Sequence, residues 1–309
     1  MEATPSSRRA AYILLTLSSL CFAGAWVAGK VAVRTMPPLA LATGRFAVAS
    51  VLLWLWASRA PGGIAWRLTR ADLALVAGMG LTAVAGYNVL FLYGLRLAPA
   101  SDGAIIVPGL VAPLTAVISW PLLRERIGRG GTLGLVLALA GMGLVMSPGW
   151  QAGRERFLGD LLFVLGAVCW ALYSVLGKVV TGRLSSVNAT LFGTLAGTVM
   201  LVPLAIAERG WTALLVAPLE AWLGLAYLGV FATVVSFVFL YEGIRRLGAT
   251  RASSFLLLVP IFGVLLSAAL LREHITPRTL AGGALVIAGL WLVQRDFRPR
   301  PAEAALQFK

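Results

Sequence analysis

Residues 122–125 read LLRE, and the same four letters return at residues 270–273, 148 positions later. The triplet FLY at residues 91–93 returns at the same distance, at residues 239–241. Between residues 91 and 145, 18 of 55 positions are identical to those 148 residues further on, without a gap. A shared bias towards Leu, Ala, Gly and Val would give roughly one identity in twelve, so the chain carries an internal duplication.

The amino-acid composition places this duplicated chain in a membrane. The chain has 309 residues, of which 59% are hydrophobic and 12% are charged, and its mean hydropathy is +0.89. Soluble domains carry about a quarter charged residues, so this chain has too few to cover a surface in water. Disorder requires low hydrophobicity, and two cysteines, Cys21 and Cys169, are too few for a secreted disulfide scaffold. A multi-pass membrane protein remains.

Ten stretches of the chain are long and apolar enough to cross a bilayer as helices, which takes about 20 residues each. The predicted spans are residues 10–29, 38–57, 73–95, 103–123, 130–146, 161–177, 188–205, 221–241, 252–271 and 279–293. Each half of the duplication holds five spans. Because five is odd, the second half enters the membrane from the opposite side, which predicts an inverted-topology repeat. The expected fold class is an all-α membrane protein with ten transmembrane helices in two inverted five-helix repeats.

The duplication also sets the predicted domain boundaries. We place the first five-helix repeat at residues 10–147, the second at residues 159–294 and a short cytoplasmic tail at residues 295–309. The first span, with arginines before an apolar run, is similar to a signal peptide. Its counterpart at residues 161–177 is an internal span, so we expect the first span to be retained as a structural helix.

The basic residues predict the orientation of the chain. With a cytoplasmic N-terminus, 17 of the 26 Lys and Arg residues fall on the cytoplasmic side and eight on the other, with Arg45 inside a span. This imbalance follows the positive-inside rule and places both termini in the cytoplasm. Topology and anionic lipid then explain the net charge of +14, so nucleic-acid binding is not expected. We expect a multi-pass protein of a bacterial-type inner membrane, with the lipid bilayer as a partner.

Short motifs add to the ten-span architecture. An Arg-Glu pair ends the fourth predicted helix of each half, Gly44-Arg45-Phe46 lies in the second span, and the fifth helices are rich in glycine. Together with the two five-helix halves, these motifs resemble the drug/metabolite transporter superfamily and, within it, the EamA-type permeases. That resemblance implies export of small metabolites, amino acids or xenobiotics through a central cavity, without nucleotide hydrolysis. It also implies that the first, third and fourth helices of each half line the cavity.

The sequence lacks the residue patterns of an enzyme or a cofactor site. It has no Walker A pattern, a single histidine (His274), and no cysteines with metal-ligand spacing. All twelve carboxylates fall in predicted loops, tails or helix ends, so a proton relay through a central carboxylate is not supported. We therefore expect no catalytic residues, no cofactor and no metal.

Arg45 is the one charged residue well inside a predicted span. An unpaired guanidinium in hydrocarbon costs at least about 2.5–3.5 kcal/mol, so this side chain is expected to face the protein interior or a wet cavity. One interpretation is that its planar fork of donors binds a substrate carboxylate. The alternatives are a structural ion pair, with Asp102 as the candidate partner, or a side chain that reaches the extracellular surface.

Other candidates follow from their positions within the spans and at the span ends. Tyr and Trp offer an apolar face and a hydrogen-bonding edge, which suits a mixed organic substrate. The cavity candidates are Trp26, Arg45, Tyr87, Asn88, Trp170, Tyr173, Ser236 and Tyr241. The gate or ion-pair candidates, with ordinary surface charges or interfacial anchors as the alternative, are Lys30, Lys178, Arg124, Glu125, Arg272, Glu273 and Asp102. The hinge candidates, where proline permits a kink, are Pro108, Pro113 and Pro260.

The sequence thus favours a secondary transporter that exports small metabolites such as amino acids by alternating access. Drug or xenobiotic efflux and nucleotide-sugar-type transport are alternatives within the same superfamily. A non-transporting membrane sensor is an alternative from another class. The expected partners are a small-molecule substrate and, through the glycine-rich helices, a second copy of the chain as a homodimer.

Overall fold

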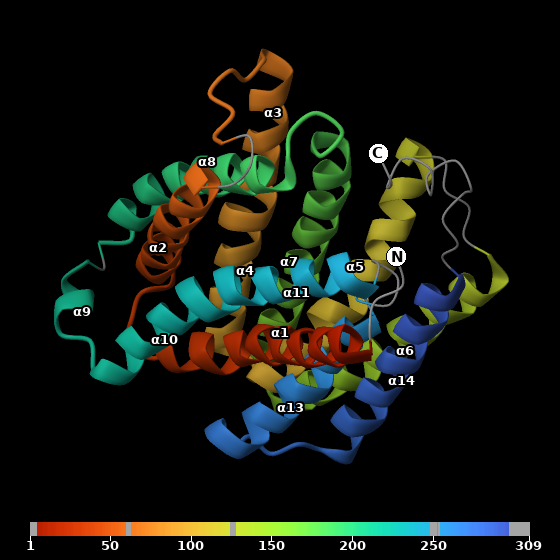
Figure 1. Ribbon diagram of the computed structural model, residues 1–309. Helices are drawn as coiled ribbons and strands as arrows, with labels where there is room; N and C mark the ends of the chain where they lie inside the picture. Colours follow the sequence, from red (N-terminus) through yellow and green to blue (C-terminus); the bar gives the residue numbers. More distant parts are fainter. Residues whose placement is uncertain are drawn as a thin grey trace.

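The computed structural model describes residues 5–59, 63–123, 128–209, 211–247, 252 and 254–296. These residues form helices and short connections, with no β-strand among them (Figure 1). Eight of the described helices are long and apolar enough to cross a membrane, and Phe255–Leu271 forms a shorter apolar helix. The all-α membrane fold is therefore confirmed, whereas ten as the number of spans stays a prediction.

The helices follow the predicted spans closely. The first half contains α1 (Pro5–Ala32), α2 (Pro38–Arg59), α3 (Arg70–Met79), η1 (Gly80–Gly86), α4 (Tyr87–Leu97), α5 (Ala100–Leu123) and α6 (Arg129–Ala152). The second half contains α7 (Arg154–Val180), α8 (Ser186–Ala207), the short α9 (Trp211–Leu215), α10 (Leu219–Val230), η2 (Phe231–Val235), α11 (Ser236–Leu247), η3 (Phe255–Leu257), α13 (Leu258–Leu271) and α14 (Pro277–Asp296).

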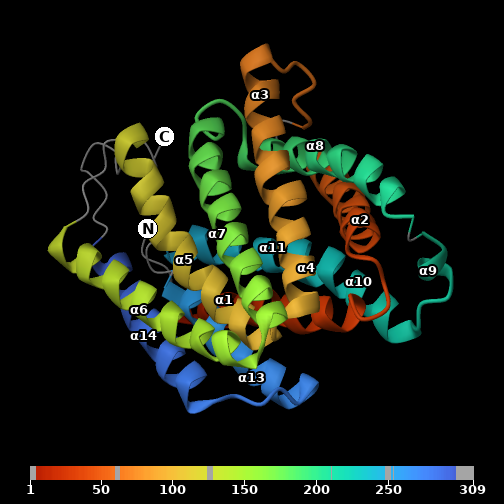
Figure 2. The ribbon, with the colours of Figure 1, turned by 180° about the vertical axis from the view of Figure 1, so that it is seen from behind.

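The two halves are interlocked by their first helices. Helix α1 packs against α10, α11 and α13 of the second half (Figure 1). In the same way, α7 packs against α3, α4 and α5 of the first half (Figure 2). Each first helix therefore completes a bundle with the third and fourth helices of the other half. This exchange brings residues from both halves to the same interior space.

Pseudo-equivalent residues meet where the second helices of the halves pack together. Ser50 Oγ on α2 and Thr198 Oγ1 on α8 lie 3.4 Å apart, and the two residues are separated by 148 positions. A contact between equivalent residues of two repeats lies on the approximate twofold axis that relates them. The α2–α8 contact therefore places this axis between the halves.

Pseudo-equivalent helices also meet at the α6–α14 crossing, where glycines bring the two backbones together. A Cβ atom placed on Gly141 would lie 2.5 Å from the carbonyl oxygen of Gly282, and one placed on Gly134 would lie 2.6 Å from that of Gly289. Small residues allow such close approach of membrane helices. The glycines that marked the duplication are therefore the residues that let its two fifth helices touch.

The third helix of each half widens into a π-helical segment. In the first half this segment is η1, between α3 and α4, and in the second half it is η2, between α10 and α11. Residues 148 positions after η1 are 228–234, which overlap η2, so both repeats carry the same widening. A π-helical turn inside an α-helix frequently occurs at a functional site.

Candidate functional site

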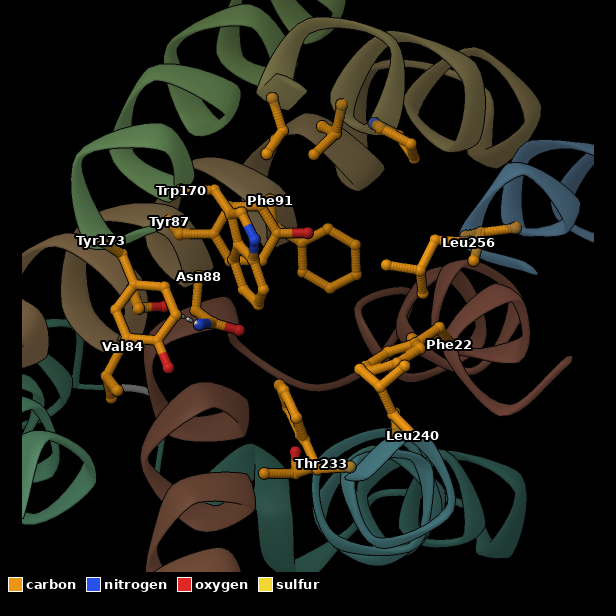
Figure 3. Close-up of a pocket in the computed structure, with 18 of the residues that line it drawn as sticks. Phe22, Val84, Tyr87, Asn88, Phe91, Trp170, Tyr173, Thr233, Leu240 and Leu256 are labelled. Carbon is orange, nitrogen blue, oxygen red and sulfur yellow. Dashed lines mark hydrogen bonds between the residues drawn. The ribbon is translucent and has the colours of Figure 1, made fainter. Parts of the chain in front are cut away.

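A cavity of about 470 Å³ lies between the two halves. Figure 3 shows Tyr87, Asn88, Phe91, Trp170 and Tyr173 on one side of it, and Phe22, Leu240 and Leu256 on the other. The structure places six of the eight predicted cavity residues in its lining, namely Trp26, Arg45, Tyr87, Asn88, Trp170 and Tyr173. These six come from α1, α2, α4 and α7.

Arg45 brings a positive charge to this cavity. The residue is only 8% exposed, yet it contributes to the cavity lining. Its Nη1 donates to Asn88 Oδ1 at 2.9 Å, while its Nη2 and Nε donate to Thr233 Oγ1 at 3.1 and 3.3 Å. A guanidinium has five N–H groups. Two of them, one on each terminal nitrogen, therefore have no acceptor among the described residues.

Within the described part of the chain, no carboxylate forms an ion pair with Arg45. The structural pairing of Arg45 with Asp102 was therefore wrong. Asp102 instead accepts hydrogen bonds from Nε and Nη2 of Arg156, at 2.9 and 2.7 Å. Asp102 lies in the first turn of α5, next to the beginning of α7, which contains Arg156. Arg45 lies two turns inside α2, away from this helix end. The guanidinium thus has neutral partners only.

The two side chains that hold Arg45 are both fixed by π-helical turns. Asn88 Nδ2 donates to the carbonyl oxygen of Ala83 at 2.8 Å, and Thr233 Oγ1 donates to that of Leu228 at 2.7 Å. Each bond spans five residues and has one end in a π-helical segment, Ala83 in η1 and Thr233 in η2. Thr233 was not among the predicted residues, because its alignment with Arg45 depends on η2. Its position as a hydroxyl inside an apolar span was the available signal.

Aromatic rings form one wall of the cavity. The ring centroids of Tyr87 and Trp170 are 4.8 Å apart, and those of Trp170 and Tyr173 are 5.5 Å apart. Tyr87 also stacks on Phe91 at 5.6 Å, and Phe91 meets Trp26 edge to face at 5.0 Å. Rings that pack on one another lose little conformational freedom when a ligand arrives. This wall is a rigid apolar surface beside the Arg45 charge.

The other two cavity candidates are placed differently. Ser236 is fully buried at the start of α11, where its Oγ donates to the carbonyl oxygen of Ala232, and it does not belong to the cavity lining. Its own carbonyl oxygen accepts a hydrogen bond from Ser18 Oγ, which ties α11 to α1. We therefore correct the prediction that Ser236 lines the cavity. The side chain of Tyr241 lies outside the described residues.

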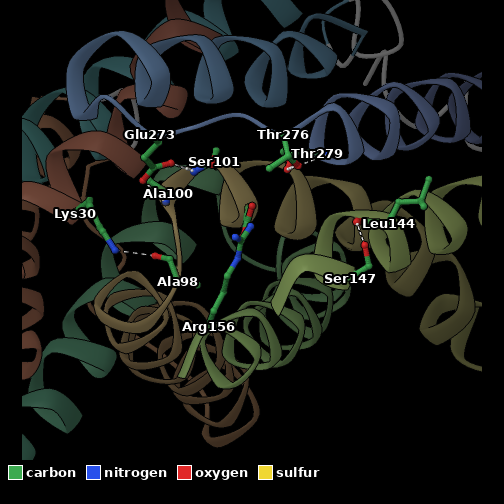
Figure 4. Close-up of polar contacts among 11 residues, drawn as sticks. Lys30, Ala98, Ala100, Ser101, Leu144, Ser147, Arg156, Glu273, Thr276 and Thr279 are labelled. Atoms are coloured by element: carbon green, nitrogen blue, oxygen red, sulfur yellow. Dashed lines mark hydrogen bonds and ion pairs between the residues drawn. The ribbon is translucent and has the colours of Figure 1, made fainter. Parts of the chain in front are cut away.

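A polar network closes one end of the helix bundle (Figure 4). Lys30, at the end of α1, donates to the carbonyl oxygens of Leu95 and Ala98 at the end of α4. Glu273, between α13 and α14, accepts from the backbone N–H groups of Ala100 and Ser101 at 2.8 and 3.0 Å. Each charge binds a helix end of opposite partial charge: the cation binds a C-terminus and the anion binds an N-terminus. The two halves are thereby joined at this end.

Of the remaining gate candidates, the structure describes Arg272 and Lys178. Arg272 adopts a left-handed conformation with φ of 55° at the end of α13, and no ion pair links it to Glu273 in the described chain. Lys178, the counterpart of Lys30, is exposed at the end of α7. Arg124 and Glu125 lie outside the described residues. A symmetric pair of gates therefore stays a prediction.

The cavity lies towards the opposite end of the bundle from this network. Its lining includes Thr190 near the start of α8, Leu256 and Leu257 just before α13, and Gln294 near the end of α14. All of these helix ends lie on the side where α1 begins, because the helices alternate in direction. The Lys30–Glu273 network therefore lies at the end of the bundle away from these lining residues.

The three hinge candidates lie inside helices that border the cavity. Pro108 in α5 belongs to the cavity lining, whereas Pro113 in α5 and Pro260 in α13 are buried. The helices continue through all three positions. Their role as flexing points stays a prediction.

A second buried carboxylate lies beside Asp102 at the closed end. Asp160 on α7 is fully buried, and neither of its carboxylate oxygens has a hydrogen-bond partner. The Oδ1 of the neighbouring Asp102 also lacks a donor. The sequence predicted that both acids lie at helix ends. Their proximity could not be predicted, because it arises from the packing of α5 on α7.

This pair predicts a substitution that increases stability. In Asp160→Asn, an amide N–H can donate towards Asp102, and the side chain can no longer ionise. We expect the free energy of unfolding to rise by about 1–3 kcal/mol. Glu155→Gln, an exposed change on the same helix, is the matched control and is expected to stay within about 0.5 kcal/mol. Thermal unfolding of the purified variants measures both. Destabilisation by Asp160→Asn alone would mean that the carboxylate has a stabilising partner.

Comparison with known proteins identifies the family of this fold. The sequence profile of the EamA-like transporter family matches residues 9–147 and, a second time, residues 157–295. The chain belongs to the EamA-like transporter family. It is therefore a multi-pass membrane protein of a transporter family, and its two matched segments begin 148 residues apart.

Individual relatives of this EamA-like transporter span nearly its whole length. It is 27% identical to the uncharacterized transporter YyaM of Bacillus subtilis, over 90% of this chain and 92% of the relative. It is 30% identical to a protein of Streptantibioticus cattleyicolor named "Probable terminal-alkyne amino-acid exporter", over 94% of this chain and 95% of the relative. A crystal structure with 21% sequence identity superposes with a TM-score of 0.62, covering 93% of this chain and 97% of that one, and supports the fold.

Proposed function

We propose that this EamA-like transporter exports small amphipathic carboxylates such as amino acids, and that Arg45 binds the substrate carboxylate. The observation that carries the proposal is a buried guanidinium at the cavity that has neutral partners only and keeps two N–H groups unused. Arginine binds carboxylates with paired, charge-assisted hydrogen bonds. The amino-acid exporter named among its relatives supports this substrate class.

The same geometry argues against two alternatives from the superfamily. A nucleotide sugar carries two phosphate charges and a sugar, and its recognition calls for several basic and hydrogen-bonding groups. Arg45 is the one Lys or Arg residue in the lining of the described cavity. Efflux of uncharged hydrophobic compounds would leave this charge without a ligand, at a cost of at least about 2.5–3.5 kcal/mol.

Transport would proceed by alternating access between the two halves. The Lys30–Glu273 network closes one end, and the cavity lies towards the other. In an inverted repeat, the reverse state exchanges the conformations of the halves, so the closed end opens and the other end closes. With the predicted orientation, the described state has its cavity towards the cytoplasm. This orientation, with both termini cytoplasmic in an inner membrane, is part of the proposal.

The proposal includes the expected absences and partners. The chain would act without catalysis and without a cofactor or metal, and the energy would come from substrate or ion gradients. It would work within a lipid bilayer, without nucleic acid. The proposal also includes a homodimer through the glycine-rich helices, of which α6 and α14 pack their glycines against each other within the chain.

Flux measurements in proteoliposomes test the function. Labelled amino acids would be offered to wild type, Arg45→Gln and Arg59→Gln, with and without a proton gradient. Arg59 is an exposed arginine at the end of α2, so it is the matched control. We expect saturable flux for wild type and Arg59→Gln and none for Arg45→Gln. Equal flux for all three proteins would contradict carboxylate binding at Arg45.

The closed end gives a separate prediction about alternating access. Glu273→Gln removes the negative charge from the start of α5, so the closed state is expected to lose stability relative to the open one. Ser101→Cys, at a buried position, would be introduced into a chain with Cys21→Ser and Cys169→Ser. We expect a several-fold faster maleimide reaction at this thiol when Glu273→Gln is added. The exposed change Glu220→Gln is the control, and equal rates with both would refute a gating role.

A further inference from the structure

Arg45 belongs to the cavity lining, and its unused donors are suited in number to a single planar anion. Asn88 and Thr233 occupy three of its five N–H groups, and the two that remain belong to different terminal nitrogens. Two N–H groups on one rigid guanidinium match the two oxygens of a carboxylate. Its neighbours Asn88 and Thr233 fix the orientation of the guanidinium from two different halves of the protein. The site therefore has a preformed place for one negative group.

The cavity has no matching place for a positive group. Neither Asp nor Glu contributes to its lining within the described chain. The described carboxylates near helix ends are engaged elsewhere: Asp72 with Arg183, Asp102 with Arg156, Glu242 with Arg246, Glu208 with the start of α2 and Glu273 with the start of α5. An ammonium group that leaves water without a counter-ion loses its hydration without electrostatic compensation. Arg45 would also repel it.

The walls around Arg45 suit a flat apolar body. Tyr87, Trp170 and Phe91 form an aromatic wall, and Leu240 and Leu256 form an aliphatic one on the facing side (Figure 3). The repeat equivalent of Arg45 is Gly193, which also belongs to the lining. The cavity therefore has a positive charge from one half and no charge at the equivalent point of the other. A ligand with one charged end and one apolar end would bind in a single orientation.

We infer that the cavity selects monoanionic carboxylic acids with a flat apolar body, and that it has no site for an α-ammonium group. This inference rests on the proposed function, in which Arg45 binds the substrate carboxylate, and it narrows the substrate class. Acids whose amino group is acylated or absent bind more tightly than the parent amino acids. Amino acids are weaker ligands of the same site, and amines without a carboxylate do not bind.

Three ligands with the same aromatic body test this selectivity. N-acetylphenylalanine lacks the ammonium charge, phenylalanine carries both charges, and phenylalaninamide lacks the carboxylate. Isothermal titration calorimetry would measure their binding to the purified full-length protein in nanodiscs. We expect N-acetylphenylalanine to bind with a Kd at least about tenfold below that of phenylalanine, and phenylalaninamide not to bind. Arg45→Gln, with Arg59→Gln as the control, is expected to remove binding of N-acetylphenylalanine.

The outcomes separate this inference from the proposed function. If phenylalanine binds more tightly than N-acetylphenylalanine, and Arg45→Gln removes its binding, the carboxylate site stands and the inference is wrong. Binding of phenylalaninamide would also overturn it, since the aromatic wall would then hold an ammonium group. If none of the three ligands binds wild type, the carboxylate site itself is wrong, and the inference with it.

Discussion

Arg45→Met is expected to abolish carboxylate binding and transport while making the protein more stable. Methionine removes the guanidinium, and with it two charge-assisted hydrogen bonds to the ligand, each worth about 1.5–3 kcal/mol. The affinity for a carboxylate ligand should fall at least about 100-fold. The same change removes a buried charge that has no counter-ion among the described residues. Replacing a buried ion pair with apolar side chains of similar volume is often neutral or stabilising, by about 1–4 kcal/mol. We expect the same sign for this charge without a counter-ion, with a smaller gain because the buried Asn88 Oδ1 loses its donor.

The loss of transport and the gain in stability have opposite signs, so together they distinguish a ligand-binding residue from a structural one. If Arg45 were a structural residue, its removal would lower both stability and transport. Asn88 and Thr233 keep their bonds to Ala83 and Leu228 in the variant, so the π-helical turns that position them remain satisfied. Thermal unfolding and ligand titration on the same purified sample measure both quantities. A destabilised variant would assign Arg45 to the fold instead of the ligand.

Arg45→Lys is the informative companion substitution. Lysine keeps the charge but has three N–H donors instead of five and no planar fork, so it cannot keep the three bonds to Asn88 and Thr233 and also pair with both oxygens of a carboxylate. We expect binding between that of wild type and Arg45→Met. Full affinity in Arg45→Lys would show that charge alone is recognised, without paired hydrogen bonds.

The sequence contained enough information to find Arg45 and Asn88, because a charge and an amide inside apolar spans are conspicuous. It did not identify Thr233, whose hydroxyl meets Arg45 only because α2 of the first half packs near η2 of the second. It also paired Asp102 with the wrong arginine. Asp102 was predicted near a helix end, but the helix end that it meets depends on the exchange of first helices between the halves.

The overall architecture was more predictable than the site, for a physical reason. A span is defined by about 20 consecutive residues, and the duplication at 148 residues adds an independent constraint on their order. The π-helical segments were not predictable in this way, since they insert extra residues into a turn without a change in hydropathy. They lie inside the third helix of each half and determine where Asn88 and Thr233 point.

Gly141→Ala is expected to destabilise the protein strongly, whereas Gly143→Ala, two residues away on the same helix, is not. A Cβ atom on Gly141 would lie 2.5 Å from the carbonyl oxygen of Gly282 and 2.8 Å from the backbone nitrogen of Val286. These are backbone atoms, so no side chain can rotate away and α6 must separate from α14. Overpacking of this kind costs typically about 1–3 kcal/mol. A Cβ atom on Gly143 would have nothing within 4 Å.

Gly141→Ala and Gly143→Ala together separate the effect of the helix–helix contact on stability from the effect of helix propensity. Both substitutions replace glycine by alanine inside α6, which by itself favours the helix by up to about 1 kcal/mol. Gly143→Ala is therefore expected to be neutral or slightly stabilising, and the difference between the two variants measures the α6–α14 contact. Gly282→Ala should match Gly141→Ala, because its Cβ atom would lie 2.6 Å from the carbonyl oxygen of Gly141. If thermal unfolding places all three variants at the same stability, the backbones of the two fifth helices do not touch, and these glycines are free to serve a contact between two copies of the chain.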